Sequence, residues 1–545
     1  MNDPNERRAL IAIVLCLAVF FVWSTFFAPK KPKPTEPPPG EVATAPVDGV
    51  TPPTVAPSPA TPALAEAPCD DQRFPVESAS VRLQVSTCGG AVRAVTFPNY
   101  DAATQVTPWW TWVWSRVKGT GSGGWDPYVA SEGKLEHLTA KGAIGLTGRG
   151  DLDDGGTFQK IADNPLTLQR VTADGLTVTK TWAPTASPDV FDLTVRYSAS
   201  VPLNGPFWVS AGDTFRKPAT SYEMVTHPSA VVDGDLEQLT DPTALKEPKD
   251  FKGPVSWFGI ENRYFVVGLA PEDPAWGVAG WAPAGERQAV RLVGPATSIA
   301  PNSPVELHFT VYAGRKDVER MSAVGHDFDK AAALGFWGFF SKILLFFLHM
   351  FHSGIGNWGA SILALTFLVR LSLYPIAARA FKSGKAMQEI QPLLKEVQEK
   401  YKDDKEAQTR ETMALWQKHN VNPLGGCLPL FIQMPVFFAL YSALMHTPDL
   451  FGASFLYLHD LSAPDPYGVL PFIMAIGMVV QQRLTPMTGM DPAQAQMMRA
   501  MPLVFALFMF GVPSGLSLYY ALNTILSIAQ QQYNTRSYQP KPAPA

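Results

Sequence analysis

Residues 366–375 read TFLVRLSLYP and place Arg370 inside a stretch that is otherwise apolar. Arg370 is the only charged residue in the interval 353–378, which is long enough to cross a hydrocarbon core of about 30 Å as a helix. It lies nine residues before Arg379, so a straight helix would place it about 13 Å deeper, near the middle of the membrane. An arginine there costs about 2.5–3.5 kcal/mol on insertion scales. The sequence therefore predicts a hydrated, polar environment, and the alternative is a side chain that snorkels to the headgroups.

Polar residues at helical spacing accompany this arginine. Thr366, Arg370 and Tyr374 are four residues apart and share one stripe of their helix. Gln433 lies in the next apolar interval, and a second stripe in the last one consists of Tyr520, Asn523, Thr524, Ser527 and Gln531. Each alone could be an interhelical hydrogen-bonding residue. None of these intervals contains Asp or Glu, so a proton or ion relay is not indicated. Together the residues predict a wet groove for a transient guest that is acidic or polar.

The basic residues predict the topology of the C-terminal half. The loop 379–421 carries nine Lys and Arg and the loop 446–467 carries none, so the first is expected in the cytoplasm and the second outside. The expected spans are 353–378, 422–445, 466–482, 497–511 and 514–533. This topology requires residues 319–352 to contribute an interfacial amphipathic helix instead of another span. A single kinked helix over the last two spans is the alternative, and it would place the C-terminus outside.

The N-terminal segment is expected to be an uncleaved membrane anchor, residues 1–28. Its apolar run 9–27 follows Arg7 and Arg8 and has no A-x-A-like cleavage site, which argues against a signal peptide and places the N-terminus in the cytoplasm. Residues 29–70 are rich in proline and read as a tether. At the other end, residues 536–545 form a short tail.

Residues 71–318 alternate polar and apolar side chains in short runs such as 81–87, 176–182 and 305–312, which predicts a large antiparallel β-sandwich. His137, His227 and His308 show no metal-ligand spacing, and no catalytic motif stands out, so a binding or scaffold domain is expected. Cys69 and Cys88 could form a disulfide in an oxidising compartment or remain as two thiols. The net charge of −4 gives no indication of nucleic-acid binding.

The loop 379–421 has its own helical periodicity. Met387, Ile390, Leu394 and Val397 recur at helical spacing, KDDK at 402–405 is a polar turn, and a helix around Trp416 returns. This pattern predicts an antiparallel helical hairpin, either a solvated connector or a docking surface for cytoplasmic partners.

Four segments carry a family resemblance: TFLVRLSLYP, NPLGGCLPLFIQMPVFFALY (422–441), LHDLSAPDPYGVLP (458–471) and PSGLSLYYALNTILSIAQQ (513–531). They resemble the YidC/Oxa1/Alb3 family of membrane protein insertases, over about the last 200 residues. STCGGAVRAVTFPNY (86–100) and ENRYFVVGLAP (261–271) resemble, more weakly, the periplasmic domain of its Gram-negative members.

The resemblance implies a multi-pass α-helical membrane protein with six transmembrane helices, five of them forming the insertase core, plus an all-β periplasmic supersandwich similar to mutarotase-like folds. It implies an inner-membrane insertase and chaperone that is not an enzyme and needs no cofactor. Its implied partners are nascent membrane proteins, the Sec translocon and membrane lipids, with ribosome–nascent chain complexes and the signal recognition particle pathway also compatible. Arg370 matches the groove arginine, Thr366 and Tyr520 match positions contacted by substrate, and the hairpin matches a region needed for activity. The tail is barely basic, so a ribosome-binding tail is not implied.

Two other classes of function stay open at this point. A solute transporter or channel would need inverted repeats or a path open to both sides, and no internal repeat is evident. A membrane-anchored carbohydrate-binding module would place the function in residues 71–318.

Overall fold

The structure is a computed structural model. It describes residues 69–101, 142–149, 156–214, 226–239, 249–251, 253–273, 278–284, 287–301, 303–332, 336–402, 404–419, 428–484 and 504–537, with short pieces at 105–106, 108–110, 113, 116, 128–129, 134–136, 138, 152–153, 334 and 502. The expected anchor 1–28, nearly all of the tether 29–70 and most of the tail lie outside these residues.

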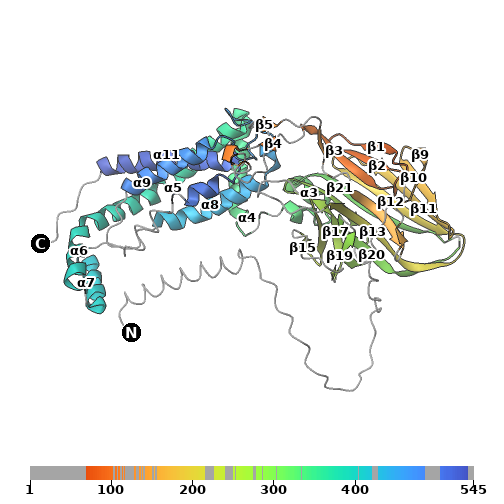
Figure 1. The fold of residues 1–545 in the computed structure, drawn as a ribbon, viewed down its shortest axis with the longest axis horizontal. Helices are drawn as coiled ribbons and strands as arrows, with labels where there is room; N and C mark the ends of the chain where they lie inside the picture. The colour runs from red at the N-terminus through yellow and green to blue at the C-terminus, as the bar shows by residue number, and fades with distance from the viewer. Residues whose placement is uncertain are drawn as a thin grey trace, which may run out of the picture. The chain divides into compact units, whose positions relative to one another are not determined.

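Residues 73–315 form two large antiparallel sheets (Figure 1). The first follows the order β1-β2-β3-β7-β13-β20-β19-β16, with β6 paired to β3 and β8 to β7, and the second the order β15-β14-β17-β18-β21-β12-β11-β10-β9. The strands of the first sheet are β1 (Arg73–Glu77), β2 (Arg82–Ser86), β3 (Val92–Asp101), β6 (Lys134–Glu136), β7 (Ala143–Arg149), β8 (Leu152–Asp153), β13 (Leu203–Thr214), β16 (Lys249–Asp250), β19 (Val278–Ala284) and β20 (Arg287–Ile299). Those of the second are β9 (Gln159–Asp163), β10 (Leu166–Val171), β11 (Leu176–Pro184), β12 (Val190–Ala199), β14 (His227–Val232), β15 (Asp235–Gln238), β17 (Val255–Glu261), β18 (Phe265–Pro271) and β21 (Val305–Arg315). A small separate sheet pairs β4 (Gln105–Val106) with β5 (Tyr128–Val129).

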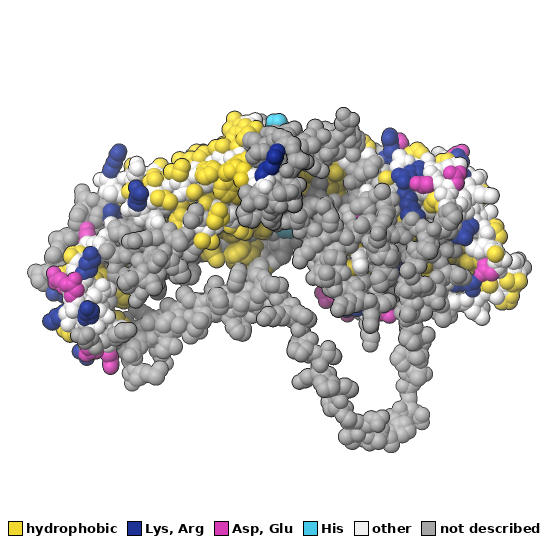
Figure 2. All heavy atoms as spheres, in the orientation of Figure 1, with side chains coloured by type: hydrophobic (Ala, Val, Ile, Leu, Met, Phe, Trp, Pro, Cys, Tyr) yellow, Lys and Arg dark blue, Asp and Glu magenta, His cyan; other side chains and the backbone are white. Residues whose placement is uncertain are grey.

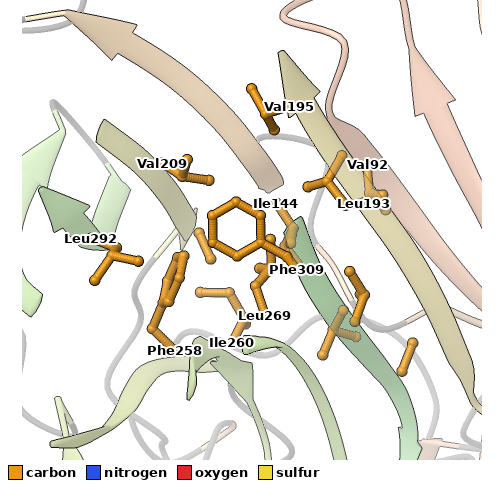
Figure 3. Packing of buried hydrophobic residues seen from close by; sticks show 14 of the residues in the cluster. Val92, Ile144, Leu193, Val195, Val209, Phe258, Ile260, Leu269, Leu292 and Phe309 are labelled. Carbon is orange, nitrogen blue, oxygen red and sulfur yellow. The ribbon is translucent and has the colours of Figure 1, made fainter. Parts of the chain in front are cut away.

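The inward-facing side chains of both sheets make one hydrophobic core (Figure 3). Alternate residues of β11 are buried, as the period of two requires. Val209 and Leu292 of the first sheet lie opposite Phe258 and Phe309 of the second, all almost fully buried. The prediction of an antiparallel sandwich is confirmed. Cys69 and Cys88 form a disulfide that holds the start of this domain to the turn after β2.

The C-terminal half is helical. Its helices are α3 (Val318–Val324), α4 (Gly338–Ile355), α5 (Trp358–Glu389), α6 (Gln391–Lys400), α7 (Lys405–Lys418), α8 (Leu428–His446), α9 (Val469–Leu484) and α11 (Ser514–Arg536), with 3₁₀ turns η2 (Phe328–Ala332) and η4 (Pro448–Leu450). Residues 504–509 are also helical and lead through a turn at 510–513 into α11. Of the described helices, α4 and α5 are long and apolar enough to cross a membrane, and α9 is a shorter apolar helix.

Many large apolar side chains lie on the outside of these helices (Figure 2). Leu371 on α5 is 74% exposed and Ile476 on α9 is 65% exposed. Side chains of this kind on a helix exterior are suited to lipid. The interior is packed tightly instead: a Cβ at Gly477 of α9 would lie 2.5 Å from the Thr524 methyl group of α11.

Helix α5 continues past the expected span end at residue 378 and reaches Glu389. Its first turn is capped by Asn357, whose side chain accepts a hydrogen bond from the Ala360 N–H. Pro392 stands in the first turn of α6, where a missing N–H costs nothing, so it separates α5 from α6 instead of kinking a helix. Leu394 of α6 packs with Trp416 of α7 to form a helical hairpin.

The loop 447–468 between α8 and α9 is folded around two carboxylates. Asp465 accepts hydrogen bonds from the backbone N–H groups of Tyr467, Gly468 and Leu470, and Asp460 accepts them from Gly452 and Ser462. The first turn of α11 is joined to this loop, because the N–H groups at 514 and 515 donate to carbonyl oxygens at 463 and 461. One end of the helical bundle is therefore covered by ordered, hydrogen-bonded chain.

Candidate substrate groove

Three polar residues reach one level of the bundle from three different helices. Arg370 lies 13 residues after the Asn357 N-cap of α5, Gln433 lies 13 residues before the last residue of α8 (446), and Ser527 lies 13 residues after the first residue of α11 (514). All three counts start at the end of the helix that meets the 447–468 loop. At 1.5 Å per residue this is about 20 Å along each axis. The helix lengths in the sequence therefore bring these side chains to a common depth.

Arg370 is turned toward α11. Its Nη2 donates to the Asn523 carbonyl oxygen at 2.9 Å and to the Ser527 hydroxyl group, which itself donates to the same carbonyl oxygen at 2.9 Å. Its Nε is buried and has no hydrogen-bond partner among the described residues. The guanidinium group thus lies between α5 and α11 and does not extend toward Arg379, as a snorkelling side chain would.

A second group of polar atoms lies beside the arginine. The hydroxyl groups of Tyr519 and Tyr520 and the Nε2 of Gln433 are buried, and within the described part of the chain none has a hydrogen bond of normal geometry. The Gln433 side chain lies beside both hydroxyl groups, and the Arg370 guanidinium group lies near that of Tyr519. Buried polar groups are rarely left unpaired, so this cluster has hydrogen-bonding capacity for water or for a guest.

The side chains of Thr366, Arg370 and Tyr374 lie in three different environments. Thr366 is fully buried and its hydroxyl group donates to the Ile362 carbonyl oxygen of its own helix at 2.7 Å. Tyr374 is 39% exposed, and its hydroxyl group donates to the Asn534 side-chain oxygen at 3.4 Å. Arg370, which is partly buried, makes its hydrogen bonds to another helix at mid-bundle.

The stripe on α11 divides as well. Ser527 faces Arg370 with its side chain, whereas Asn523 contacts Arg370 through its backbone carbonyl oxygen. Tyr520 lies against the Phe437 ring of α8, with 5.3 Å between ring centroids. Thr524 and Gln531 turn to α9 instead, the first at Gly477 and the second through a 3.4 Å hydrogen bond to the carbonyl oxygen at position 484. Thr524 meets α9 with its methyl group, while its hydroxyl group donates to the Tyr520 carbonyl oxygen of its own helix at 2.8 Å.

The β-sandwich offers no metal-binding cluster among the residues that the structure describes. His227 lies 3.3 Å from the fully buried Glu261, whose second oxygen is 2.8 Å from Lys316. Burial raises the pKa of Glu261, but the charges of Lys316 and His227 outweigh it and hold that pKa well below its usual range. The Glu261–Lys316 ion pair links β17 to the residues just before α3, and His227 of β14 lies beside it. His308 contacts Thr194 on a strand surface, and His137 lies outside the described residues.

Two family models match the chain. The model described as "60Kd inner membrane protein" matches residues 350–541, and the model described as "YidC periplasmic domain" matches residues 144–347. The membrane protein insertase YidC of Geobacter sulfurreducens is 32% identical over 553 residues, covering 98% of each chain, and that of Geobacter metallireducens is 30% identical over 552 residues with the same coverage. The chain belongs to the YidC family of membrane protein insertases.

Membership in the YidC family settles several predictions. The expected family is confirmed, and with it an inner-membrane insertase with a β-sandwich periplasmic domain that is not an enzyme. A solved YidC insertase structure is similar over 86% of this chain and 94% of that chain, at 18% identity and a TM-score of 0.36. An aldose epimerase homologue from C. elegans covers 45% of this chain at 8% identity and a TM-score of 0.29, which carries no argument for a sugar ligand.

Tyr519 is a candidate groove residue that the sequence analysis did not include. It is fully buried and lies between Tyr520 and the arginine-bearing face of α5. The signal was present in the sequence, because 519, 523 and 527 are four residues apart and define the stripe that faces Arg370. Both tyrosines are buried, so the interior of the bundle receives Tyr519 as well as Tyr520.

Proposed function

We propose that this insertase receives the polar flank of a nascent membrane segment beside Arg370, in a groove formed with Gln433, Tyr519, Tyr520 and Ser527. The observation that carries the proposal is the arginine's pairing: among the described residues it contacts only neutral groups, and no carboxylate lies with it. A partly buried cation without a fixed counter-charge attracts an acidic or strongly polar guest.

The attraction between Arg370 and an acidic guest is similar in size to the cost of moving the guest's charge into the membrane. Moving one charged side chain to mid-membrane costs about 2.5–3.5 kcal/mol on insertion scales. A carboxylate about 5 Å from the guanidinium would gain about 3 kcal/mol at an effective dielectric constant of about 20. The groove can thus offset most of the cost of one acidic residue, and the buried tyrosine and glutamine groups can hydrogen-bond the guest's backbone.

The apolar part of the guest leaves along the outside of the bundle. Phe367 and Leu371 of α5 are more than half exposed and flank Arg370 in sequence, so a guest held at the arginine lies near a lipid-facing surface. Burial of its apolar side chains in lipid supplies the driving force. Nothing in this mechanism requires nucleotide hydrolysis.

The proposed topology has six transmembrane helices with both termini in the cytoplasm. The anchor within 1–28 is one, and the core 353–535 supplies the others at about 353–378, 422–445, 466–482, 497–511 and 514–533, with the hairpin 379–421 in the cytoplasm. The basic residues support this arrangement, since the covered end of the bundle carries the Lys/Arg-free loop and the opposite end carries Arg379, Arg483 and Arg536.

We propose that α4 lies along the outer membrane surface as an interfacial helix, although it is long enough to cross. Near its start Ser341 donates to the Ala439 carbonyl oxygen at 2.8 Å, and near its end the His352 ring stacks on Trp358 at 3.7 Å. Ala439 is seven residues from the loop end of α8 and Trp358 begins α5. Both ends of α4 therefore stay within about 11 Å of the covered end of the bundle, which supports an oblique or surface position.

Nascent membrane proteins are the substrates and association with the Sec translocon is general in this family. We propose that ribosome–nascent chain complexes approach from the hairpin side, and that the periplasmic domain, 71–318, serves as a scaffold. A solute transporter or channel, the alternative function, is not favoured by the family membership.

Insertion into vesicles containing only the purified chain tests this function. A single-span substrate with a short acidic flank should become protected from protease, and Gln433→Leu should lower the yield while Met434→Leu, at an exposed neighbouring position, should not. Equal protection in protein-free vesicles, or solute flux without insertion, would contradict the proposal.

A further inference from the structure

A tryptophan-rich piece of the β domain touches the covered end of the helical bundle. The sequence between β3 and β6 contains PWWTWVW at 108–114, with four tryptophans in six residues, followed by Arg116. The structure describes Trp109, Trp110, Val113 and Arg116 of this piece, all helical, and they are called the Trp-rich segment below. The insertase mechanism makes no use of it.

Two kinds of contact fix this segment to the bundle. The Trp109 backbone N–H donates to the Pro466 carbonyl oxygen at 3.1 Å, and its indole N–H donates to the Tyr467 carbonyl oxygen at 3.2 Å. The Trp110 ring meets the Phe510 ring edge-on, with 4.7 Å between centroids. The segment therefore contacts the residues just before α9 and the turn that precedes α11.

The contact with Phe510 continues into an apolar exterior. Phe510 packs against Phe472 at 5.4 Å, and Phe472 is 48% exposed on α9, one turn before the 65% exposed Ile476. These α9 side chains belong to the surface that a membrane protein presents to lipid. Trp110 thus extends the lipid-facing surface beyond the end of the helix.

The composition of the segment suits the boundary between lipid and water. Val113 is one of the helical residues of this segment, and its side chain is 39% exposed. Tryptophan concentrates at membrane interfaces because its ring is apolar and its N–H is polar.

We propose that the Trp-rich segment is a second membrane contact of the β domain, which inserts into the headgroup region of the outer leaflet beside α9. The partner is the lipid surface, and Val113 points into it. This inference is independent of the groove, because it concerns the β domain and not the path of the guest.

A fluorescent probe at Val113 tests the proposal. The full chain carries Cys16→Ser and Cys427→Ser, keeps the Cys69–Cys88 disulfide, and receives a single Val113→Cys labelled with an environment-sensitive dye in lipid nanodiscs of phosphatidylethanolamine and phosphatidylglycerol. Because both faces of a nanodisc are accessible, aqueous iodide and lipids spin-labelled near the headgroup can each reach any exposed probe.

Two reference positions give the quenching expected for a probe in water and for a probe in lipid. Ile161→Cys on β9, 56% exposed, reports a water-facing site, and Ile476→Cys on α9 reports a lipid-facing one. The expected result at Val113 is strong quenching by the shallow spin label and several-fold weaker iodide quenching than at Ile161. Iodide quenching equal to that at Ile161 would overturn the proposal, and so would protection from both quenchers, which would mean burial against protein.

Discussion

Replacing Arg370 with alanine should selectively impair the insertion of segments with an acidic flank. The structure places the guanidinium group about 20 Å from the covered end, held by two hydrogen bonds to α11 and without a carboxylate partner in the described chain. A flank carboxylate about 5 Å away would lose an interaction of at most about 3 kcal/mol. Water in the groove weakens this to about 1.5–3 kcal/mol, so the rate should fall about 10–100-fold, because each 1.4 kcal/mol is about tenfold.

The assay compares one substrate with its charge-neutral twin. Insertion rates are measured in proteoliposomes for a flank carrying Asp and for the same flank with Asn. Arg370→Ala should slow the Asp substrate by the factor above and the Asn substrate by less than about threefold, since a neutral amide feels little of the charge. Arg370→Lys keeps the charge and should retain most of the Asp insertion, with some loss because lysine lacks the planar fork of donors.

One variant separates charge from structure. Arg370→Ala also removes the link between α5 and α11, so Ser527→Ala serves as the control, because it removes one acceptor of that link and leaves the charge. Ser527→Ala should slow both substrates equally and by less than about tenfold, as expected for one hydrogen bond worth about 1 kcal/mol. Equal losses of the Asp and Asn substrates in Arg370→Ala would refute the reasoning.

Three further predictions concern stability. Gly477→Val should lower the free energy of unfolding in detergent by about 1–3 kcal/mol because a Cβ there meets α11 at 2.5 Å, whereas Gly384→Val, with nothing within 4 Å of its Cβ, should not lower it; an undiminished stability of Gly477→Val would contradict the close packing. Burial raises the pKa of Asp449, but its hydrogen bond to the His349 ring and the Arg315 charge hold that pKa below its usual value. Its stabilisation is then present at neutral pH and is lost as pH falls through the lowered pKa, so Asp449→Asn should destabilise more at pH 7 than at pH 3 in thermal unfolding; an equal gap at both pH values would contradict this. Replacing Cys69 and Cys88 with serine opens a loop with a sequence separation of 19 and should cost the β domain about 3 kcal/mol in denaturant unfolding; an unchanged midpoint would show that the bond does not stabilise it.

Local pattern was enough to predict the β-sandwich and the hairpin. Alternation over 176–182 and 305–312 reports burial of every second residue, and the strands β11 and β21 cover both runs. The end of α5 was not predictable in the same way, because the charges after residue 378 mark where lipid ends and not where the helix ends. That stretch continues as helix to Glu389, with Ile390 and the α6 helix following at once.

The sequence predicted the depth of the candidate groove residues along their helices, but not which neighbouring helix each side chain contacts. Spacing placed Thr366, Arg370 and Tyr374 on one stripe, yet Thr366 bonds its own backbone and Tyr374 reaches the exposed end of the bundle. Such differences depend on which helix lies opposite each turn, and a single sequence does not contain that information.

Crosslinking from the groove to a stalled insertion intermediate tests the central claim most directly. A photoreactive residue at Gln433, at the depth of Arg370, is compared with one at Leu371, which is 74% exposed. The account predicts that the polar flank of the guest crosslinks from position 433 and its apolar segment from position 371. A flank that crosslinks from position 371 and not from position 433 would show that the guest bypasses the arginine.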